Sequence, residues 1–497
     1  MKPMTKYACE LDRIYGTETE YGLYWKGEKM DIFNVVNKDF TRTIFYLDSN
    51  LTSFTMLFLK NGSMIKKDNL GGDGYNDCTP EYATPECRSA RDAVCWEKAG
   101  EAIMRDLFDL SGRNSSNFLM VKHGRGLANP PGIGNPGTEV TCGHHENYSY
   151  DEELKEEFKK DSWEALVFMS FLASRILFSG AGWVDSRGFY QLSQRADFIE
   201  QKTNTVTTQN RPLVCTRDEP LGTLSPPRFH LIAGEHLMSE VALYLTLGST
   251  GLILRMLESG CGFSDAPILS DPVESLRLFS FDPALKIESA LSGIKKEIRA
   301  LEIQNYFCAK AKEFINHNPS TEEEHDIVDY WASVLSRLGE DIYSLYGELD
   351  WVTKLCFMES YLKKHGIQPE NIGDFHGTPT QILDYCMGID LTYHFITPDG
   401  LYNKLKSSGS VKRLLTDGEI FNAVANPPQD TRAKIRGEMA RLLITGKIKG
   451  WIHNWNSFGF GECPTNPLLK GALVAMEDPF DFHCQSWQDR KRSLGPI

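Results

Sequence analysis

The clearest chemical signal near the start of the chain is a pair of glutamates two residues apart. Glu18 and Glu20 lie within RIYGTETEYGLYW (residues 13–25), whose alternation predicts a β-strand. Residues two apart on a strand point to the same face, about 7 Å apart. Two such carboxylates repel each other unless a cation lies between them, and Mg²⁺ favours oxygen ligands of this kind. The alternative is a solvated strand face.

A second candidate is Asp68, which we expect at the end of a strand covering residues 54–67. It follows NGSMIKK and precedes a glycine loop, and Glu81 begins the next ordered segment, PEYATPE. An aspartate near metal-binding glutamates can act as a base or a nucleophile. The alternative is a turn residue, because Asp before Asn-Leu-Gly-Gly is common in turns. Asp77 is a rival that lies closer to Glu81 in the sequence.

The histidines and arginines add candidates for metal and phosphate binding. In CGHHENY, strand alternation places His145 and Asn147 on one face, and His230 lies in the apolar string RFHLIAG. A lone histidine in an apolar strand is more often a core residue than a ligand. The planar guanidinium group of an arginine can donate two parallel hydrogen bonds to phosphate oxygens. Each of these arginines could equally form an ion pair with a neighbouring acidic residue. The arginines in polar contexts are Arg195, Arg217, Arg432 and Arg436.

The elements that must position these side chains follow an α+β pattern. Strands are expected in the first half of the chain and helices in the second. The ranges expected to be strands are 13–25, 54–67, 189–200 and 227–234, and those expected to be helical are 88–110, 151–179 and most of 236–365. The segment 124–137, rich in Gly and Pro, is expected to be loop. A small C-terminal module is expected from about residue 416. Neither GxxxxGK[ST] nor GxGxxG occurs, so any nucleotide site is of another type.

Composition narrows the class of protein. The chain has 497 residues and a net charge of −14, which argues against a nucleic-acid surface. Its 12 cysteines are scattered, without a CxxC pair, and we expect them to be reduced. The N-terminal residues contain no apolar leader, and the apolar stretch 165–178 is interrupted by Arg175 and is too short to cross a bilayer. We therefore expect a cytoplasmic protein.

Several strings occur together in an order that is specific to one family. They are GTETEYG, NG-x5-D, PEYATPE, DAVCWEKAGE, GHHENY, SQRADFIE, TRDEP, FHLIAGE and NPPQDTRAKIRGE. In these strings the chain resembles the Pup ligase and Pup deamidase/depupylase family, over residues 13 to about 455. The resemblance implies a glutamine synthetase-like fold, in which helices back a curved antiparallel sheet. It also implies a catalytic domain at 1–415 and a small C-terminal domain at 416–497.

The family has two branches with opposite reactions. In the ligase, ATP phosphorylates the C-terminal glutamate of the modifier Pup and a substrate lysine attacks it, whereas in the depupylase water attacks the side-chain amide or isopeptide carbonyl. The strings DAVCWEKAGE, GELDWVTKL and GLYNKLKSSGSVKRLLT resemble the depupylase. The short segment 22–68 instead resembles the ligase, because depupylases carry a long insertion there. A third reading is a low-activity nucleotide-binding paralogue that acts as an adaptor.

The resemblance also implies site residues, cofactors and partners. It implies two Mg²⁺ ions and ATP, a Pup-like modifier and its conjugates as partners, neither nucleic acid nor membrane, and a monomer. Asp68 falls on the catalytic position. The implied metal ligands are Glu18, Glu20, Glu81, His145 and His230, and the implied nucleotide-binding residues are Thr84, Arg195, Arg217, Arg432 and Trp451.

The chain departs from the family pattern at several positions. The family usually has Arg and Tyr four and two residues before the catalytic aspartate, where this chain has Met64 and Lys66. Leu237 stands in place of an asparagine, and Lys122-His123-Gly124 replaces a KNN string. Two placements of Lys66 stay open, an ion pair with Asp68 or a position in solvent. The changes suggest a substrate other than standard Pup, or reduced activity.

Overall fold

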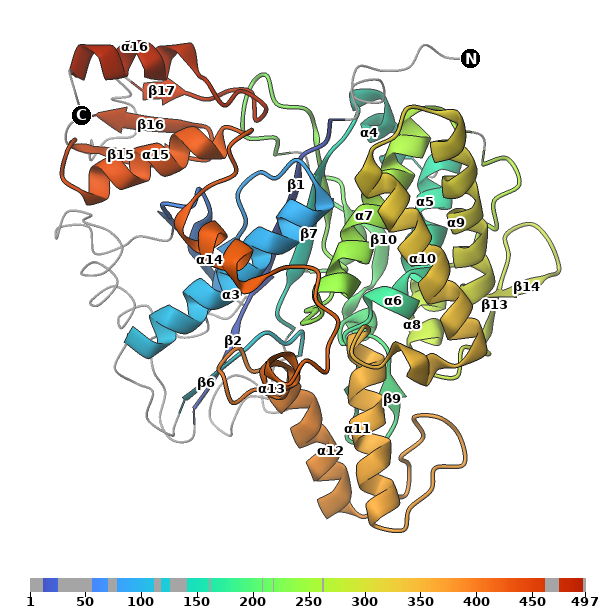
Figure 1. Ribbon diagram of the computed structural model, residues 1–497. Helices are drawn as coiled ribbons and strands as arrows, with labels where there is room; N and C mark the ends of the chain where they lie inside the picture. The colour runs from blue at the N-terminus through green and yellow to red at the C-terminus, as the bar shows by residue number, and fades with distance from the viewer. Residues whose placement is uncertain are drawn as a thin grey trace. The chain divides into compact units, whose positions relative to one another are not determined.

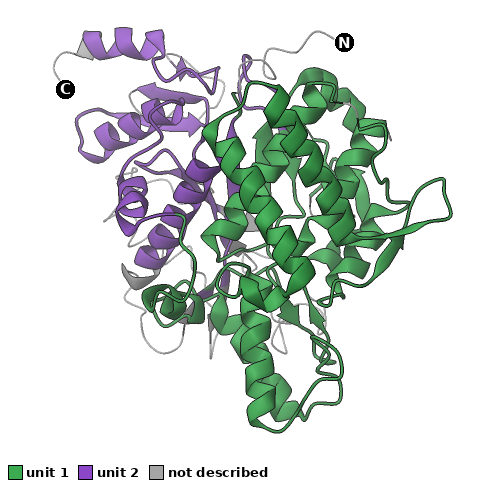
Figure 2. Ribbon diagram, turned by 45° about the vertical axis from the view of Figure 1, so that its right-hand side comes forward, with its two compact units in different colours: residues 1–13, 121–217, 229–414 green, residues 14–120, 218–228, 415–497 purple. Residues whose placement is uncertain are grey.

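A computed structural model describes ten stretches of the chain, and Figure 2 divides it into two compact units. The described stretches are 12–25, 56–69, 78–110, 118–125, 141–160, 162–207, 209–217, 219–261, 263–460 and 473–494. Unit 1 contains residues 1–13, 121–217 and 229–414, and unit 2 contains residues 14–120, 218–228 and 415–497. Within unit 1 the strands of the large sheet follow the order β10-β11-β12-β7, and within unit 2 they follow the order β1-β5-β4-β3. The expected α+β class is confirmed.

The strands that carry the acids lie in unit 2. They are β1 (Tyr15–Glu20), β3 (Met56–Phe58), β4 (Met64–Asn69) and β5 (Cys78–Ala83), and the pairs β1–β5, β4–β5 and β3–β4 are antiparallel. β2 (Gly22–Trp25) pairs with β6 (Phe118–Val121) in a separate two-stranded sheet. The single strand expected at 54–67 is a hairpin instead. Its turn contains Gly62 at φ +80°, a conformation that glycine adopts readily.

Helix α3 (Ala90–Leu110) confirms the helix expected at 88–110 and lies against β5. The hydroxyl of Tyr82 donates to the carbonyl of Trp96, at 3.0 Å. A Cβ at Gly100 would lie only 2.4 Å from the Tyr82 ring, so this glycine lets the strand and the helix approach closely. The contact fixes the position of β5, the strand that carries Glu81.

The C-terminal part of unit 2 has a hydrophobic core of its own. The core includes Met439, Phe458 and Trp487, all fully buried. The surrounding elements are α15 (Ala433–Ile444), β15 (Gly450–Asn454), β16 (Ser457–Phe460), β17 (Leu473–Ala475) and α16 (Gln485–Leu494), near the C label in Figure 1. Helix α14 (Asp417–Ala425) packs against α3 instead. A self-contained core is what a small C-terminal module needs. The domain boundary at 415/416 itself stays a prediction.

The strands of unit 1 include those that carry the histidines. They are β7 (His144–Ser149), β8 (Trp183–Val184), β9 (Tyr190–Gln191), β10 (Gln201–Asn204), β11 (Pro212–Cys215) and β12 (Arg228–Leu231), whose first residue belongs to unit 2. β11 and β12 are antiparallel, whereas β10 and β11 are parallel. In the range 189–200, only β9 is a strand, and a short 3₁₀-helix follows at Ala196–Phe198.

Helices make up most of unit 1 after residue 236, as expected. They are α7 (Glu240–Glu258), α8 (Pro272–Ser280), α9 (Ala300–His317), α10 (Glu322–Glu340), α11 (Asp350–Lys364), α12 (Thr380–Tyr393) and α13 (Leu401–Ser407), interrupted by strands β13 (Glu288–Ala290) and β14 (Glu297–Arg299). The single helix expected at 151–179 is wrong. That range forms α4 (Glu152–Phe158), α5 (Trp163–Ser174) and α6 (Ile176–Ser179), because Ser162 caps a new helix by accepting from the backbone N–H of Ala165.

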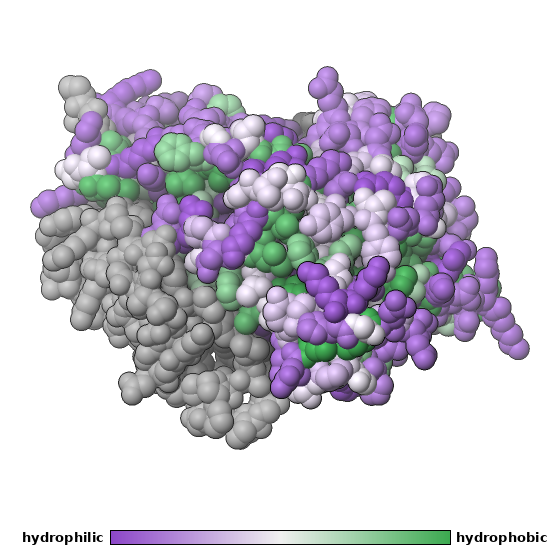
Figure 3. Space-filling model, turned by 60° about the horizontal axis from the view of Figure 1, so that its bottom comes forward, coloured by the Kyte–Doolittle hydropathy of each residue, from purple (hydrophilic) through white to green (hydrophobic). Residues whose placement is uncertain are grey.

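Apolar side chains are mostly buried. Helix α7 is long and apolar enough to cross a membrane by composition, but all of that stretch is buried inside the protein, as in a core helix. On the face in Figure 3, apolar residues form small patches among polar ones. Scattered apolar residues of this kind are ordinary on folded proteins. The expected loop at 124–137 lies outside the described residues from residue 126 onward.

Candidate active site

Three strands of unit 2 place the predicted acids in rows on one sheet face. Glu20 is the register partner of Glu81, and Glu81 is in turn the partner of Lys66. Glu18 lies two residues before Glu20 and therefore on the same face. Asp68 occupies β4 two positions beyond Lys66, opposite Thr79 and one residue before the strand ends. The sheet thus brings together the positions predicted from the sequence, whereas Asp77 lies outside the described residues.

Lys66 forms an ion pair with Glu81. Its Nζ lies 3.0 Å from Oε1 of Glu81, whose side chain is almost wholly buried, and the Lys66 side chain is 28% exposed. Neither of the two placements left open for Lys66 includes this contact. The lysine supplies a positive charge to a carboxylate that is predicted to bind metal.

Arg228 is a residue of this site that the sequence analysis missed. Its Nη1 lies 3.3 Å from Oε1 of Glu18, and its Nη2 lies 3.3 Å from Oε2 of Glu219. The string PPRF contained no signal beyond a lone arginine before an apolar strand. The guanidinium is only 19% exposed, so its attraction to Glu18 is screened less than on an open surface.

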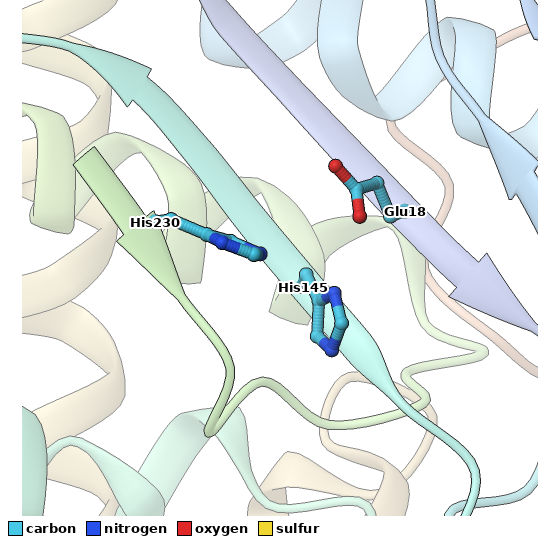
Figure 4. A group of neighbouring side chains, drawn as sticks. All are labelled: Glu18, His145 and His230. Atoms are coloured by element: carbon cyan, nitrogen blue, oxygen red, sulfur yellow. The ribbon is translucent and has the colours of Figure 1, made fainter. Parts of the chain in front are cut away.

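The two predicted histidine ligands lie side by side. His145 comes from β7 and His230 from β12, and their ring centroids are 5.0 Å apart. Figure 4 shows the two rings next to each other, and Glu18 is the third ligand predicted from the sequence. Two imidazoles and a carboxylate form a donor set that suits a divalent cation. These residues therefore fit the metal that the sequence analysis expected.

Two of the predicted phosphate-binding arginines differ in what surrounds them. Arg195 is buried, and Nη1 of its guanidinium donates to the carbonyl oxygens of His144 at 3.1 Å and Gly234 at 2.9 Å. Arg217 follows β11 and is exposed. Arg195 thus joins segments of unit 1. Their roles with a nucleotide stay predictions.

Thr84 also has a structural contact. Its Oγ1 accepts from the backbone N–H of Thr17 at 2.8 Å, and its own N–H donates to the Thr17 carbonyl at 2.9 Å. The hydroxyl therefore holds the end of β5 to β1. Trp451 lies on β15 opposite Gly459, and a Cβ on that glycine would lie 2.4 Å from the indole ring. The ring therefore lies across the neighbouring strand.

Arg432 and Arg436 enclose a buried acid, Glu86. Nε of Arg432 donates to Glu86 at 2.7 Å, and Arg436 forms a second ion pair with it. Arg432 also donates to the carbonyls of Leu221 at 2.9 Å and Met476 at 3.0 Å. Burial raises the pKa of Glu86, but the charges of Arg436 and Arg432 outweigh this effect and lower the pKa to about 2. For Arg432 the sequence left two possibilities, phosphate binding and an ion pair with an acidic residue. The ion pair with Glu86 confirms the second.

A second cluster of metal-type ligands lies in the interior of unit 1. His123, Asp390 and His394 bring three ligand atoms within 4.8 Å of one another. Nζ of Lys354 lies 2.6 Å from Asp390 and 2.9 Å from Nε2 of His394. Burial lowers the pKa of His394, and the neutral ring accepts from the lysine. Since an ammonium already supplies the positive charge, this cluster forms a buried structural network.

Most of the residues that depart from the family pattern have buried side chains. Met64 packs with Phe58 and Ala83 in a small apolar cluster. Leu237 is buried as well, and its carbonyl accepts from the buried Nζ of Lys122 at 2.7 Å. These residues are integrated into the fold, so the departures are accommodated without loss of packing.

Comparison with known proteins decides the family. The model described as Pup-ligase protein matches residues 13–458. The chain belongs to the Pup ligase and depupylase family. It is 35% identical to a depupylase from Acidothermus cellulolyticus over 427 residues, which is 82% of this chain and 78% of that protein. It is 32% identical to a Pup–protein ligase from Pseudarthrobacter chlorophenolicus over 461 residues, which is 89% of this chain and 92% of that one.

Solved structures agree with the family. The Pup ligase PafA in complex with Pup matches with a TM-score of 0.77 and 25% identity, over 99% of this chain and 94% of that one. PafA in complex with ADP matches with a TM-score of 0.72 and 26% identity, over 94% and 95%. The protein is therefore a member of this enzyme family and has the fold of a Pup ligase. Its relatives include both depupylases and ligases.

Proposed function

We propose that the protein is an ATP- and Mg²⁺-dependent depupylase or deamidase. It would hydrolyse the glutamyl side-chain amide, or the isopeptide bond to lysine, of a Pup-like modifier. The observation that carries the proposal is the acidic sheet face, where Glu18, Glu20 and Glu81 lie in adjacent rows and Asp68 follows on β4. In this family, carboxylates on such a face can bind metal ions, which in turn hold the nucleotide phosphates close to the glutamyl carbonyl of the substrate.

The metal-binding part of the proposal rests on Glu18, His145 and His230. The two imidazoles lie next to each other in unit 1, and the Glu18 carboxylate would supply the hard oxygen that Mg²⁺ favours. When bound, the ion would neutralise nucleotide phosphates and keep nearby carboxylates ionised. Glu20 and Glu81 would keep the neighbouring face negative, and Arg228 would have to yield its contact with Glu18.

Asp68 is proposed to do the chemistry. As a carboxylate it can attack the glutamyl carbonyl, so that the C–N bond breaks and the protonated amine leaves, and water then hydrolyses the short-lived anhydride. Alternatively, it can take a proton from the attacking water and pass it to the leaving amine. Its backbone position near the end of β4, two residues after Lys66, supports either role. In a ligase the same residue would take a proton from the substrate lysine, so Asp68 does not decide the direction.

ATP binding is supported by the ADP complex of the related Pup ligase. Arg217, an exposed residue, is proposed to contact phosphate directly. Arg195, Arg432 and Thr84 already make contacts within the protein, and we propose that they shape the nucleotide site as well. Trp451 is proposed to contact the adenine.

Hydrolysis is proposed over ligation because three strings spread along the chain resemble the depupylase branch. Depupylases and ligases both occur among the relatives, and the complex of PafA with Pup supports a Pup-like partner for either direction. The short segment 22–68 favours the ligase, which is the second candidate. An adaptor that binds nucleotide without turnover is the third. The protein is proposed to act as a cytoplasmic monomer.

Calorimetry with ATP tests the site. Glu18→Ala should remove Mg²⁺-dependent ATP binding while the thermal unfolding of the protein stays unchanged. Glu153→Ala on the exposed first turn of α4 is the matched control, and it should bind ATP as the wild type does. Equal, metal-independent ATP affinity in wild type and Glu18→Ala would refute the assignment of the acidic face.

A further inference from the structure

The row formed by Glu20, Glu81 and Lys66 combines two acids and one fixed cation. The three residues are direct register partners across β1, β5 and β4, so their side chains share a face at the spacing of cross-strand pairs. Glu20 is 8% exposed and Glu81 is fully buried. Neighbouring carboxylates with so little water around them repel each other strongly, and they need a positive charge close by.

Lys66 supplies that charge from within the chain. Its Nζ lies 3.0 Å from Glu81, and the backbone register holds the lysine directly opposite the acid. A tethered ammonium competes for the carboxylate at a high effective concentration, unlike an ion from solution. A divalent ion bound to Glu81 would also lie close to the ammonium, and the two positive charges would repel each other.

We propose that the Lys66 ammonium replaces one divalent cation on the Glu20–Glu81 pair. Where the resemblance implied two ions, this protein would bind one, held by Glu18, His145 and His230. Lys66 thereby sets the metal stoichiometry of the site. The single remaining ion rests on the proposed function, whereas the role of Lys66 rests on the contacts within unit 2.

Counting bound Mn²⁺ by equilibrium dialysis, without nucleotide, tests the proposal. The wild type should bind one ion per chain. Lys66→Gln removes the charge at similar size and should bind two, whereas Lys66→Arg keeps the charge and should bind one. Circular dichroism should show the same fold in each variant, and Lys66→Met provides a second neutral side chain in case Lys66→Gln folds poorly.

A second substitution, Glu18→Ala, distinguishes a failure of the role proposed for Lys66 from a failure of the metal site proposed at Glu18. Glu18→Ala should reduce the wild type from one ion to none, and it should reduce Lys66→Gln from two ions to one. Two ions in the wild type, or one ion in both neutral variants, would overturn the role of Lys66. No ion in the wild type with one in Lys66→Gln would support the role of Lys66 and refute the site at Glu18.

Discussion

The guanidinium of Arg228 lies 3.3 Å from the carboxylate of Glu18. The acid that is proposed to bind metal therefore already has a cationic partner within unit 2. The same guanidinium contacts Glu219 at 3.3 Å, so Arg228 has a second acid to which it can shift. A metal ion at Glu18 would have to compete with Arg228, so we expect this arginine to weaken metal binding.

Replacing Arg228 should therefore tighten metal binding. We expect Arg228→Gln to raise the affinity for Mn²⁺ about fivefold, equivalent to about 1 kcal/mol for the loss of a partly exposed ion pair. Titration calorimetry with Mn²⁺ measures the change. Arg299→Gln, which removes an equal charge from an exposed ion pair in unit 1, is the control and should leave the affinity unchanged. Weaker binding in Arg228→Gln would show that the arginine supports the metal site.

Asp68 rather than Asp77 should carry the chemistry. Asp68→Asn should lower the rate of cleavage by roughly 10²–10⁴-fold, because a lost base or nucleophile commonly costs that much. Asp77→Asn should keep most of the activity. Release of modifier from a conjugate, followed by gel or mass spectrometry, measures both rates, and ATP binding serves as the folding control. An inactive Asp77→Asn beside an active Asp68→Asn would reverse the assignment.

Glu86 should make the stability of the protein depend on pH in the acid range. Its pKa is lowered from 4.5 to about 2 in the folded state, so its contribution is complete above pH 4.5 and disappears as the pH falls toward 2. At pH 7, Glu86→Gln should lower the free energy of unfolding by about 3–5 kcal/mol, since two buried arginines lose their counter-charge. Urea denaturation measures this.

The pH series provides the control for that prediction. The difference in stability between the wild type and Glu86→Gln should shrink below pH 4.5, because Glu86 then gains a proton in the unfolded state while it stays ionised in the folded state until the pH nears 2. Glu156→Gln, at an exposed position on α4, should show little difference at any pH. A constant difference between pH 7 and pH 3 would mean that the ionised form of Glu86 is not what stabilises the fold.

Local patterns predicted the acidic face well. Alternation in GTETEYG placed Glu18 and Glu20 on one strand face, and the spacing NG-x5-D placed Asp68 near the end of a strand. Both follow from the two-residue period of a β-strand, which needs no knowledge of distant contacts. The ion pair between Lys66 and Glu81 depends instead on the register of β4 against β5, which the sequence does not display.

The arginines show the limit of this approach. A polar context suggested phosphate binding for both Arg195 and Arg432, yet each makes several hydrogen bonds to the backbone of distant segments. Such contacts depend on the tertiary fold, as does the contact of Arg228 with Glu18. The broken helix at 151–179 has a local cause, since Ser162 is an ordinary capping residue in a sequence that remained helical on both sides.

Two of the strings that favour the depupylase branch consist mainly of buried residues. Val94, Cys95 and Trp96 of DAVCWEKAGE are buried, as are Trp351 and Lys354 of GELDWVTKL. Similarity at buried positions usually reflects packing and does not identify the reaction. The direction of the reaction therefore needs a direct measurement.

Offering the purified enzyme both substrates provides that measurement. One reaction contains a modifier–lysine conjugate, the other contains free modifier ending in glutamate with a lysine acceptor, and both contain Mg²⁺ and ATP. Mass spectrometry follows the modifier while ADP release is measured alongside. We expect release of the modifier with far less than one ADP formed per bond cleaved. Formation of conjugate with one ADP per bond would contradict the proposal and identify the protein as a ligase.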